Sequence, residues 1–388
     1  LTQYAQDVIR RTVTSNADDG VGTRRQTSID AGAGDTITFN AGMSITLTTG
    51  QLSIAKNLTI DGDLDNDGTA DVTVNGNAAS RVLDITSGTV VLDGLTITNG
   101  KLAGANGSGG SALGAGISVT GGTTQVNILH SGISGNAATG GTGSNAPNFG
   151  TGGTGGNGAG GLYVGSGATV QMAASTLTGN TGTGGSGGYG YDAGGTGGNG
   201  TGGVLVAGGG TFRYQSGTVT ISSNTGTDGI GGDAPPTFGT PGSFGTSSPN
   251  ISGASDGTWV YDAPPTVTSV NSSTPDGTYK VGSLIYIQVN FSENVVVAGG
   301  TPLLTLETGG TDRAIDYTSG TGSSTLTFTY LVQAGDTTAD LDYTAINALA
   351  LNGSTLRDAA GNNAIRTLAS PGAANSLGAN KAIVIDGV

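Results

Sequence analysis

The chain has 388 residues, a formal net charge of −14 and no cysteine. The missing cysteines exclude disulfides and thiolate metal sites, and the excess of acidic residues disfavours a nucleic-acid partner, which needs a basic stripe. Glycine contributes 76 residues, but neither a strict three-residue period nor abundant proline supports collagen. No apolar run is long enough for a transmembrane helix, so we expect no membrane span.

Residues 1–34 are predicted to form an N-terminal arm or cap. Residues 4–11 suit either one short helix or an extended arm. The chain begins at Leu1 without a signal-like segment, so we expect either a removed leader or a larger polypeptide.

From residue 35 onward, short runs of three to five residues alternate between apolar and polar side chains. β-branched and aliphatic residues dominate each run, and glycine, asparagine or aspartate closes it, as in short strands joined by turns. These runs alone allow a sandwich, a barrel or a solenoid.

One turn between these runs has the spacing of a calcium-binding loop. Positions 1, 3, 5, 7 and 9 of that loop are Asp63, Asp65, Asp67, Thr69 and Asp71. Gly68 supplies the turn at position 6, but Val74 at position 12 leaves no glutamate to close the loop. Clustered carboxylates repel each other without a cation. We therefore predict a Ca²⁺ site, with a solvated acidic turn as the alternative.

A repeat of 44 residues decides between the possible architectures. The element at residues 133–136 recurs at 177–180 and again at 221–224. A fixed period of this length indicates stacked units. One copy contains three predicted strands, near residues 162–164, 169–172 and 175–177, which would make one triangular coil. We predict a right-handed parallel β-helix over residues 35–232.

Two features of the repeat have more than one interpretation. Asn136, Asn180 and Asn224 either stack as an amide ladder at one corner or reflect a simple turn preference. The glycine-rich insertions that fill the rest of each period are either flexible loops or an ordered layer of stacked segments.

Beyond the repeat the composition changes twice. Prolines punctuate residues 233–263, which we predict to be a linker. Residues 264–388 contain less glycine and longer alternating runs, with turns about every dozen residues, which is typical of an immunoglobulin-like sandwich. The predicted fold class is therefore all-β.

Two family resemblances accompany these patterns. The runs at residues 35–39, 58–62 and 92–100 resemble the β-helix passengers of bacterial surface adhesins and polymorphic outer-membrane proteins, over about residues 12–230. The elements at residues 263–267, 276–280, 291–293, 339–343, 357–362 and 381–386 resemble bacterial Ig-like repeats. The second resemblance implies a spacer or adhesive module, often stiffened by Ca²⁺, rather than an enzyme.

A second, weaker metal site is predicted in this C-terminal module. Its candidate ligands are Asp262, Glu293, Asp340, Asp342, Asp358 and Asp386. Two of them stand before and after the module, as linker carboxylates would, and the others could converge near one pole. Ordinary strand-end turns are the alternative interpretation.

Catalysis has little support in the sequence. His130 is the only histidine, which we interpret as a solvent or corner residue, and no nucleophile elbow or phosphate loop is found. We predict no enzyme, with a polysaccharide lyase or hydrolase on a β-helix scaffold as the alternative. A second alternative is a carbohydrate-binding tip, for which the candidate platforms are Tyr163, Tyr189, Tyr191 and Tyr214.

The expected function is structural: an extracellular, cell-surface bacterial adhesin, or a subunit of a self-assembling filament or coat. Solenoid ends carry unpaired backbone groups that must be capped or joined to a neighbour. We therefore expect head-to-tail self-association, with residues 1–30 either capping their own coil or adding a strand to the next subunit. A cell-surface or glycan ligand is also expected.

Overall fold

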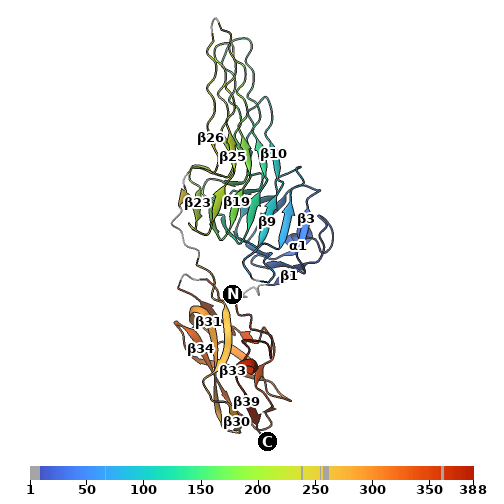
Figure 1. The fold of residues 1–388 in the computed structure, drawn as a ribbon, viewed down its shortest axis with the longest axis vertical. Helices are drawn as coiled ribbons and strands as arrows, with labels where there is room; N and C mark the ends of the chain where they lie inside the picture. Colours follow the sequence, from blue (N-terminus) through green and yellow to red (C-terminus); the bar gives the residue numbers. More distant parts are fainter. Residues whose placement is uncertain (1–8, 66, 237–238, 254, 257–261, 360–361) are drawn as a thin grey trace, which may run out of the picture. The chain divides into compact units, whose positions relative to one another are not determined.

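The computed structural model describes residues 9–65, 67–236, 239–253, 255–256, 262–359 and 362–388. The chain divides into two compact units, Leu1–Tyr261 and Asp262–Val388. Within the described residues, helix is limited to α1 (Arg24–Asp30) and α2 (Leu377–Asn380), and strands make up the remaining regular structure. The predicted all-β class, with a parallel β-helix and a β-sandwich, is confirmed (Figure 1).

Three parallel sheets form the coil of the first unit. Sheet A contains β1 (Arg10–Val13), β2 (Thr36–Phe39), β5 (Leu58–Asp61), β8 (Thr89–Asp93), β13 (Gln125–Leu129), β18 (Thr169–Ala173), β23 (Thr211–Tyr214) and β28 (Ser255–Asp256). Sheet B contains β3 (Met43–Thr46), β6 (Val72–Asn75), β9 (Leu95–Thr98), β14 (Gly132–Ser134), β19 (Thr176–Thr178) and β24 (Thr220–Ser222). Sheet C contains β4 (Leu52–Ala55), β7 (Leu83–Ser87), β12 (Ile117–Val119), β17 (Leu162–Val164), β22 (Val204–Val206) and β27 (Ile251–Ser252).

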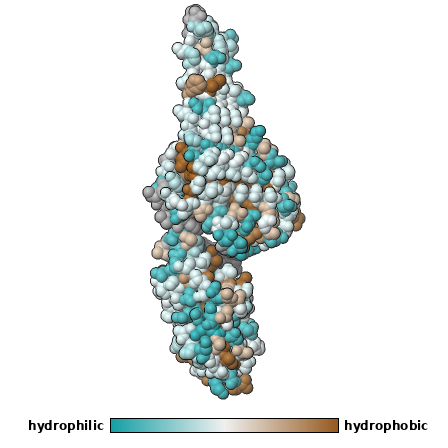
Figure 2. Space-filling view, viewed as in Figure 1, coloured by the Kyte–Doolittle hydropathy of each residue, from teal (hydrophilic) through white to brown (hydrophobic). Residues whose placement is uncertain are grey.

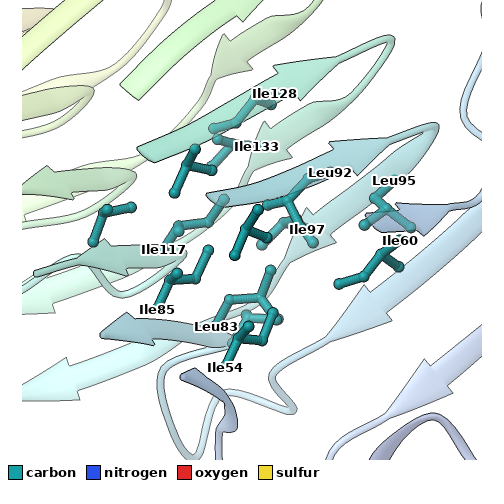
Figure 3. Packing of buried hydrophobic residues seen from close by; sticks show 14 of the residues in the cluster. Ile54, Ile60, Leu83, Ile85, Leu92, Leu95, Ile97, Ile117, Ile128 and Ile133 are labelled. Carbon is teal, nitrogen blue, oxygen red and sulfur yellow. The ribbon is translucent and has the colours of Figure 1, made fainter. Parts of the chain in front are cut away.

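Apolar side chains stack in columns inside this coil, because successive strands pair in parallel register. Leu83 pairs with Ile117 and Ile117 with Leu162 in sheet C, while Ile97 pairs with Ile133 in sheet B. All five side chains are buried, and Figure 3 shows several members of these columns packed between the sheets. Removal of this apolar surface from water, at roughly 25 cal/mol per Å², is the main force that holds the coils together.

An asparagine ladder runs along one corner of the coil. Asn136 donates its side-chain amide to Oδ1 of Asn180 at 2.9 Å, and Asn180 donates in the same way to Asn224 at 3.0 Å. Asn136 and Asn180 are fully buried and Asn224 nearly so. The ladder interpretation of the 44-residue repeat is therefore confirmed, and each asparagine lies where the chain leaves sheet B.

The glycine-rich insertions are ordered. They leave the coil through sheet D, which contains β10 (Lys101–Ala103), β15 (Ala137–Thr139), β20 (Thr181–Thr183) and β25 (Thr225–Thr227). They return through sheet E, which contains β11 (Ala112–Leu113), β16 (Gly158–Ala159), β21 (Gly200–Thr201) and β26 (Ser247–Ser248). We call this projection the glycine tower, and it comprises residues 104–111, 137–158, 181–201, 225–236 and 239–248 (Figure 1).

Hydrogen bonds in the glycine tower follow a three-residue period, as expected for packed segments of the polyproline II type. Gly184 and Gly187 donate to the carbonyls of Thr227 and Ile230 in the next repeat, both at 2.8 Å. Gly185 donates to Gly156 in the preceding repeat, also at 2.8 Å. Neighbouring segments therefore satisfy each other's backbone groups, which a flexible loop would leave to water.

The close approach of these segments requires glycine. A Cβ placed on Gly185 would lie 2.0 Å from the carbonyl oxygen of Gly141, and one on Gly198 would lie 2.0 Å from that of Gly156. No side-chain rotation relieves such an overlap, because both groups belong to backbone. The abundance of glycine is thus a packing requirement of the tower.

The predicted N-terminal arm or cap is partly coil. Residues 1–8 lie outside the described residues, but β1 pairs in parallel with β2 as the first strand of sheet A. Helix α1 follows, with Thr23 as its N-cap accepting from the backbone of Gln26. The described part of this segment therefore extends the solenoid, because its apolar Val13 is buried in the same core.

Asp18 ties this first turn to the coil. Its carboxylate accepts hydrogen bonds from the backbone amides of Thr48 at 2.8 Å and Thr49 at 2.7 Å, and pairs with Arg25 at 2.9 Å. Burial raises the pKa of Asp18, but the hydrogen bonds from Thr49, Thr48 and Arg25 outweigh it and lower the pKa to about 2.

We predict that Asp18→Asn destabilises the protein at neutral pH and progressively less in acid. The folded-state pKa lies below the unfolded value of about 3.9, so the stabilisation is present above that pH and is lost as pH falls toward 2. Denaturant unfolding of both proteins between neutral pH and strong acid measures this. A stability difference that does not shrink in acid would contradict the assignment.

The predicted linker over residues 233–263 is wrong in part. Strands β26, β27 and β28 fall within it and pair with β21, β22 and β23 of the preceding repeat. Proline is tolerated here because these are edge strands and proline can still accept: Pro249 receives a hydrogen bond from Gly203 at 2.9 Å. Residues 257–261 lie outside the described residues.

The second unit is a β-sandwich. Its large curled sheet contains β29 (Val267–Ser272), β31 (Leu284–Gly299), β34 (Ser323–Leu331), β33 (Arg313–Ser319), β32 (Leu303–Glu307), β36 (Asp342–Tyr343), β37 (Leu349–Ala350) and β38 (Ser354–Arg357). A three-stranded sheet contains β30 (Gly277–Lys280), β39 (Ile383–Asp386) and β35 (Thr337–Thr338). The strands of this unit pair antiparallel except for β30 and β39, which pair in parallel. Buried side chains from both sheets, including Ile287, Phe328 and Ile385, belong to one hydrophobic core.

Candidate metal centres

The acidic loop predicted to bind Ca²⁺ lies between β5 and β6, at a corner of the coil. Asp63 is 7% exposed and accepts from the backbone amides of Asp67 at 3.1 Å and Gly68 at 3.0 Å. Gly68 adopts a left-handed φ of +81°, which lets the chain reverse around the carboxylate. The loop is therefore wrapped around Asp63 in the manner that its spacing predicts.

The structure brings three of the four predicted carboxylate ligands together. Carboxylate oxygens of Asp63, Asp65 and Asp71 lie within 4.8 Å of one another. Asp67 is outside this group, because its Oδ1 accepts from the amide of Thr69 at 2.8 Å and from its hydroxyl at 2.6 Å. Oxygen donors of this kind suit Ca²⁺.

Further ionisable groups surround the loop. Asp61, at the end of β5, pairs in register with Asp93 at the end of β8, and His130 follows β13 in the next coil. His130 Nδ1 lies 2.8 Å from Asp93 Oδ1. Burial raises the pKa of Asp61, and the negative charges of Asp93 and Asp63 raise it further against the lowering effect of Arg10. This corner therefore concentrates negative charge.

In the second unit, half of the predicted ligands converge. Oxygens of Asp262, Glu293 and Asp358 lie within 4.8 Å of one another. Burial raises the pKa of Glu293, and the charges of Asp262 and Asp358 add to this rise. Asn362 donates its side-chain amide to Asp358 at 2.8 Å and to the Asp262 carbonyl at 3.0 Å, which holds the two segments together.

The other predicted ligands of this unit are outside that group. Asp386 pairs with Lys280 at 3.6 Å, at the ends of β39 and β30. Asp340 and Asp342 lie close to each other, and burial, followed by the charge of Asp342, raises the pKa of Asp340. The six residues therefore do not form one site.

Sequence reasoning missed the role of His130. It occupies a corner, as predicted, but its ring pairs with Asp93 and approaches the acidic loop, where an ideal Cβ on Gly68 would lie 3.4 Å from His130 Cδ2. The 44-residue repeat gives no signal of this pairing, because the register between β8 and β13 in sheet A is 36 residues.

The four candidate tyrosine platforms are distributed over two regions. Tyr163 and Tyr214 belong to coil strands, and the Tyr214 ring stacks on Phe212 with centroids 5.7 Å apart. Tyr189 and Tyr191 lie in the glycine tower, where Tyr191 contacts Phe149 with centroids 5.2 Å apart. The structure thus separates the four residues into coil and tower pairs.

By its fold the chain is a parallel β-helix protein with an appended β-sandwich. No protein family, curated protein or solved structure matches it. Among the helices that the structure describes, none has the length and apolar character needed to cross a membrane.

Proposed function

We propose that the chain is a structural, extracellular surface protein whose glycine tower presents an adhesive tip away from the coil. The observation that carries this proposal is the hydrogen-bonded order of the tower, since a flexible loop would not hold a tip at a defined position. The resemblance of residues 12–230 to bacterial adhesin passengers supports a place at the cell surface. We propose no enzymatic activity.

The far end of the tower has the features of a contact surface. Beyond the hydrogen bond from Gly153 to Ser144, Phe149 is 80% exposed and adopts φ +102°. Asp192 holds this turn by accepting from the amide of Gly150 at 2.8 Å. Positive φ is energetically unfavourable for a bulky residue, so it persists only where the surrounding structure fixes the backbone.

The tower surface as a whole carries few charges, since Asp192, Asp228 and Asp233 are the ionisable acidic and basic residues of its segments. Figure 2 shows it as mostly pale with few brown patches, and its exposed large apolar side chains are Phe149, Ile230 and Phe244. Aromatic rings combine a large apolar face with little conformational entropy, which suits contact with a sugar or a protein surface. This supports a cell-surface or glycan ligand at the tip.

A shortened tower tests the proposal. The variant replaces 145–152, 189–194 and 233–241 by short glycine–serine linkers, so that the tower ends at the hydrogen bonds joining Ser144 to Gly153, Gly188 to Gly195 and Gly232 to Gly242. We expect beads coated with this variant to lose binding to cells and glycan surfaces that the intact chain binds. Equal binding by both, with equal melting temperature of the coil, would contradict an adhesive tip.

Calcium is proposed as a stabilising ligand of the Asp63, Asp65 and Asp71 group. Binding to the folded state alone raises stability by mass action, so the melting temperature should rise as Ca²⁺ is added to chelator-treated protein. Asp65→Asn should weaken the apparent affinity by about 10-fold or more, since an exposed ligand is lost. Asp228→Asn, an exposed carboxylate outside the group, is the control and should leave the titration unchanged.

Head-to-tail self-association is proposed on the open sheet edges of the coil. In the part of the chain that the structure describes, β1 is the first strand of sheet A and pairs with β2 on one side only, so its outer edge is open to a further strand. Because β1 pairs with β2 of its own chain, the segment that could be added as a strand to a neighbouring subunit is limited to residues 1–8. Electron microscopy of the full chain and of a variant lacking 1–8 tests this, and polymers formed by both would exclude strand donation.

A further inference from the structure

We propose that Asp63, Asp93 and His130 form a binding site for a divalent transition-metal ion such as Zn²⁺. The three residues lie at the same corner of three successive coils, after β5, β8 and β13, and are 30 or more positions apart in the sequence. Their convergence is therefore a product of the stacked fold and not of one local turn.

The structure brings one donor atom from each of the three residues close together. One ligand atom of each residue lies within 4.8 Å of the others, and Asp93 Oδ1 is 2.8 Å from His130 Nδ1. Tetrahedral Zn²⁺ needs donors about 3.3 Å apart, given Zn–N and Zn–O distances near 2.0 Å. The Asp93 and His130 side chains are 27% and 32% exposed, so both have room to rotate toward that spacing.

The imidazole distinguishes this site from the neighbouring calcium group. Ca²⁺ and Mg²⁺ take oxygen ligands, whereas imidazole nitrogen selects zinc and its transition-metal neighbours. His130 is the only histidine in the chain, and it lies against this acidic loop.

The negative charge concentrated at this corner favours binding of a cation. Asp61, Asp63 and Asp93 lie together, and the one ion pair that the described residues form with Asp61 is to Arg10, at 3.5 Å. The Arg10 side chain is 67% exposed, so solvent screens that pair and it compensates little. A cavity of about 280 Å³ is lined in part by Arg10, Asp61 and Asp63, so it reaches one of the three proposed ligands, Asp63.

The left-handed backbone conformation of His130, with φ +44°, is a feature of the coil corner and is not imposed by metal binding. Gly94 and Ala174 occupy the equivalent corners of the neighbouring coils, with φ +61° and +45°. Since alanine is native at one of these corners, His130→Ala removes the imidazole without a new backbone demand. The substitution therefore isolates the nitrogen ligand.

The test uses the full chain after removal of metals by chelation. Titration with Co²⁺, followed by visible absorption, reports a nitrogen-containing ligand set, and Zn²⁺ added afterwards should displace the Co²⁺ spectrum. We expect His130→Ala and Asp93→Asn each to weaken Co²⁺ binding by about 10-fold or more. Both should keep the wild-type melting temperature in chelator.

Asp65→Asn is the matched control, because it alters the calcium group and leaves the three proposed ligands intact. It should keep the Co²⁺ affinity of the wild type while weakening the Ca²⁺ response, and His130→Ala should do the reverse. Co²⁺ binding by His130→Ala with wild-type affinity and spectrum would overturn the proposal. So would a wild-type chain that shows neither a Co²⁺ spectrum nor a rise in melting temperature with Zn²⁺.

Discussion

Replacing Gly198 by alanine is expected to unfold the glycine tower while the coil stays folded. Gly198 donates to Gly185 and accepts from Gly229, both at 2.8 Å, so it lies in the middle of the packed segments. The new Cβ would lie 2.0 Å from the Gly156 carbonyl oxygen. Because backbone must move to admit it, we expect a loss of about 3 kcal/mol or more in the stability of the tower.

Hydrogen–deuterium exchange of peptides from 137–158 and 181–201 measures this effect. A loss of that size corresponds to exchange that is about 100-fold faster, if the tower opens as one unit. Gly208→Ala is the matched control, because an ideal Cβ there meets no atom within 4 Å and the residue has no left-handed φ. Equal protection in the two variants would show that the segments are not packed as described.

The order of the tower marks the limit of what the sequence predicts. The 44-residue period and the alternating runs predicted the coil, because the core columns need one apolar residue per strand at each level. Glycine content suits both flexible and ordered insertions, so composition alone does not decide between them. The feature that distinguishes an ordered from a flexible insertion is the Gly-Gly-X spacing of segments such as 152–157 and 194–199. With this spacing two glycines can pack inside while every third residue points its side chain outward.

The acidic group of this loop was predictable because its members are local in sequence. Asp63, Asp65 and Asp71 are held by one turn, so spacing alone brings them together. The pairing of Asp93 with His130 depends on the register of sheet A. That register is 36 residues at this coil rather than 44, so the repeat did not reveal it.

The acidic residues of the second unit show the same limit. Glu293 lies where the pairing of β31 with β34 shifts register, between Asn290 and Val295. Such an irregularity re-aims a side chain, and here it lies beside Asp262 and Asp358. The alternating pattern of the strand does not predict this shift in register. The sequence therefore could not show that these three residues converge while Asp340, Asp342 and Asp386 do not.

Asn180→Ala is expected to be the most damaging substitution in the coil that leaves its apolar core intact. The Asn180 amide donates to the Ile133 carbonyl at 2.9 Å and to Asn224 Oδ1 at 3.0 Å, and its Oδ1 accepts from the backbone of Asn136 at 3.1 Å. The residue is fully buried, so water does not replace these partners. Each orphaned group costs about 1–3 kcal/mol, and we expect a total loss of about 3 kcal/mol.

Denaturant unfolding of Asn180→Ala and Asn145→Ala compares a buried with an exposed asparagine. Asn145 makes one side-chain hydrogen bond, to the amide of Tyr189 at 2.8 Å, and is exposed. Its removal should cost about 1 kcal/mol or less. Losses of similar size in the two variants would mean that the ladder adds no more than an ordinary surface hydrogen bond.

Asn180→Asp separates hydrogen bonding from shape, because the new side chain has nearly the same volume but loses both amide donors. Two oxygens, the Ile133 carbonyl and Asn224 Oδ1, then face the carboxyl group. Burial without a cation raises a carboxyl pKa above its unfolded value, so this variant should be most stable below about pH 4 and should lose stability as pH rises. If the difference in melting temperature between this variant and the wild type did not change with pH, water would have to reach this corner, and the ladder would not be shielded from solvent.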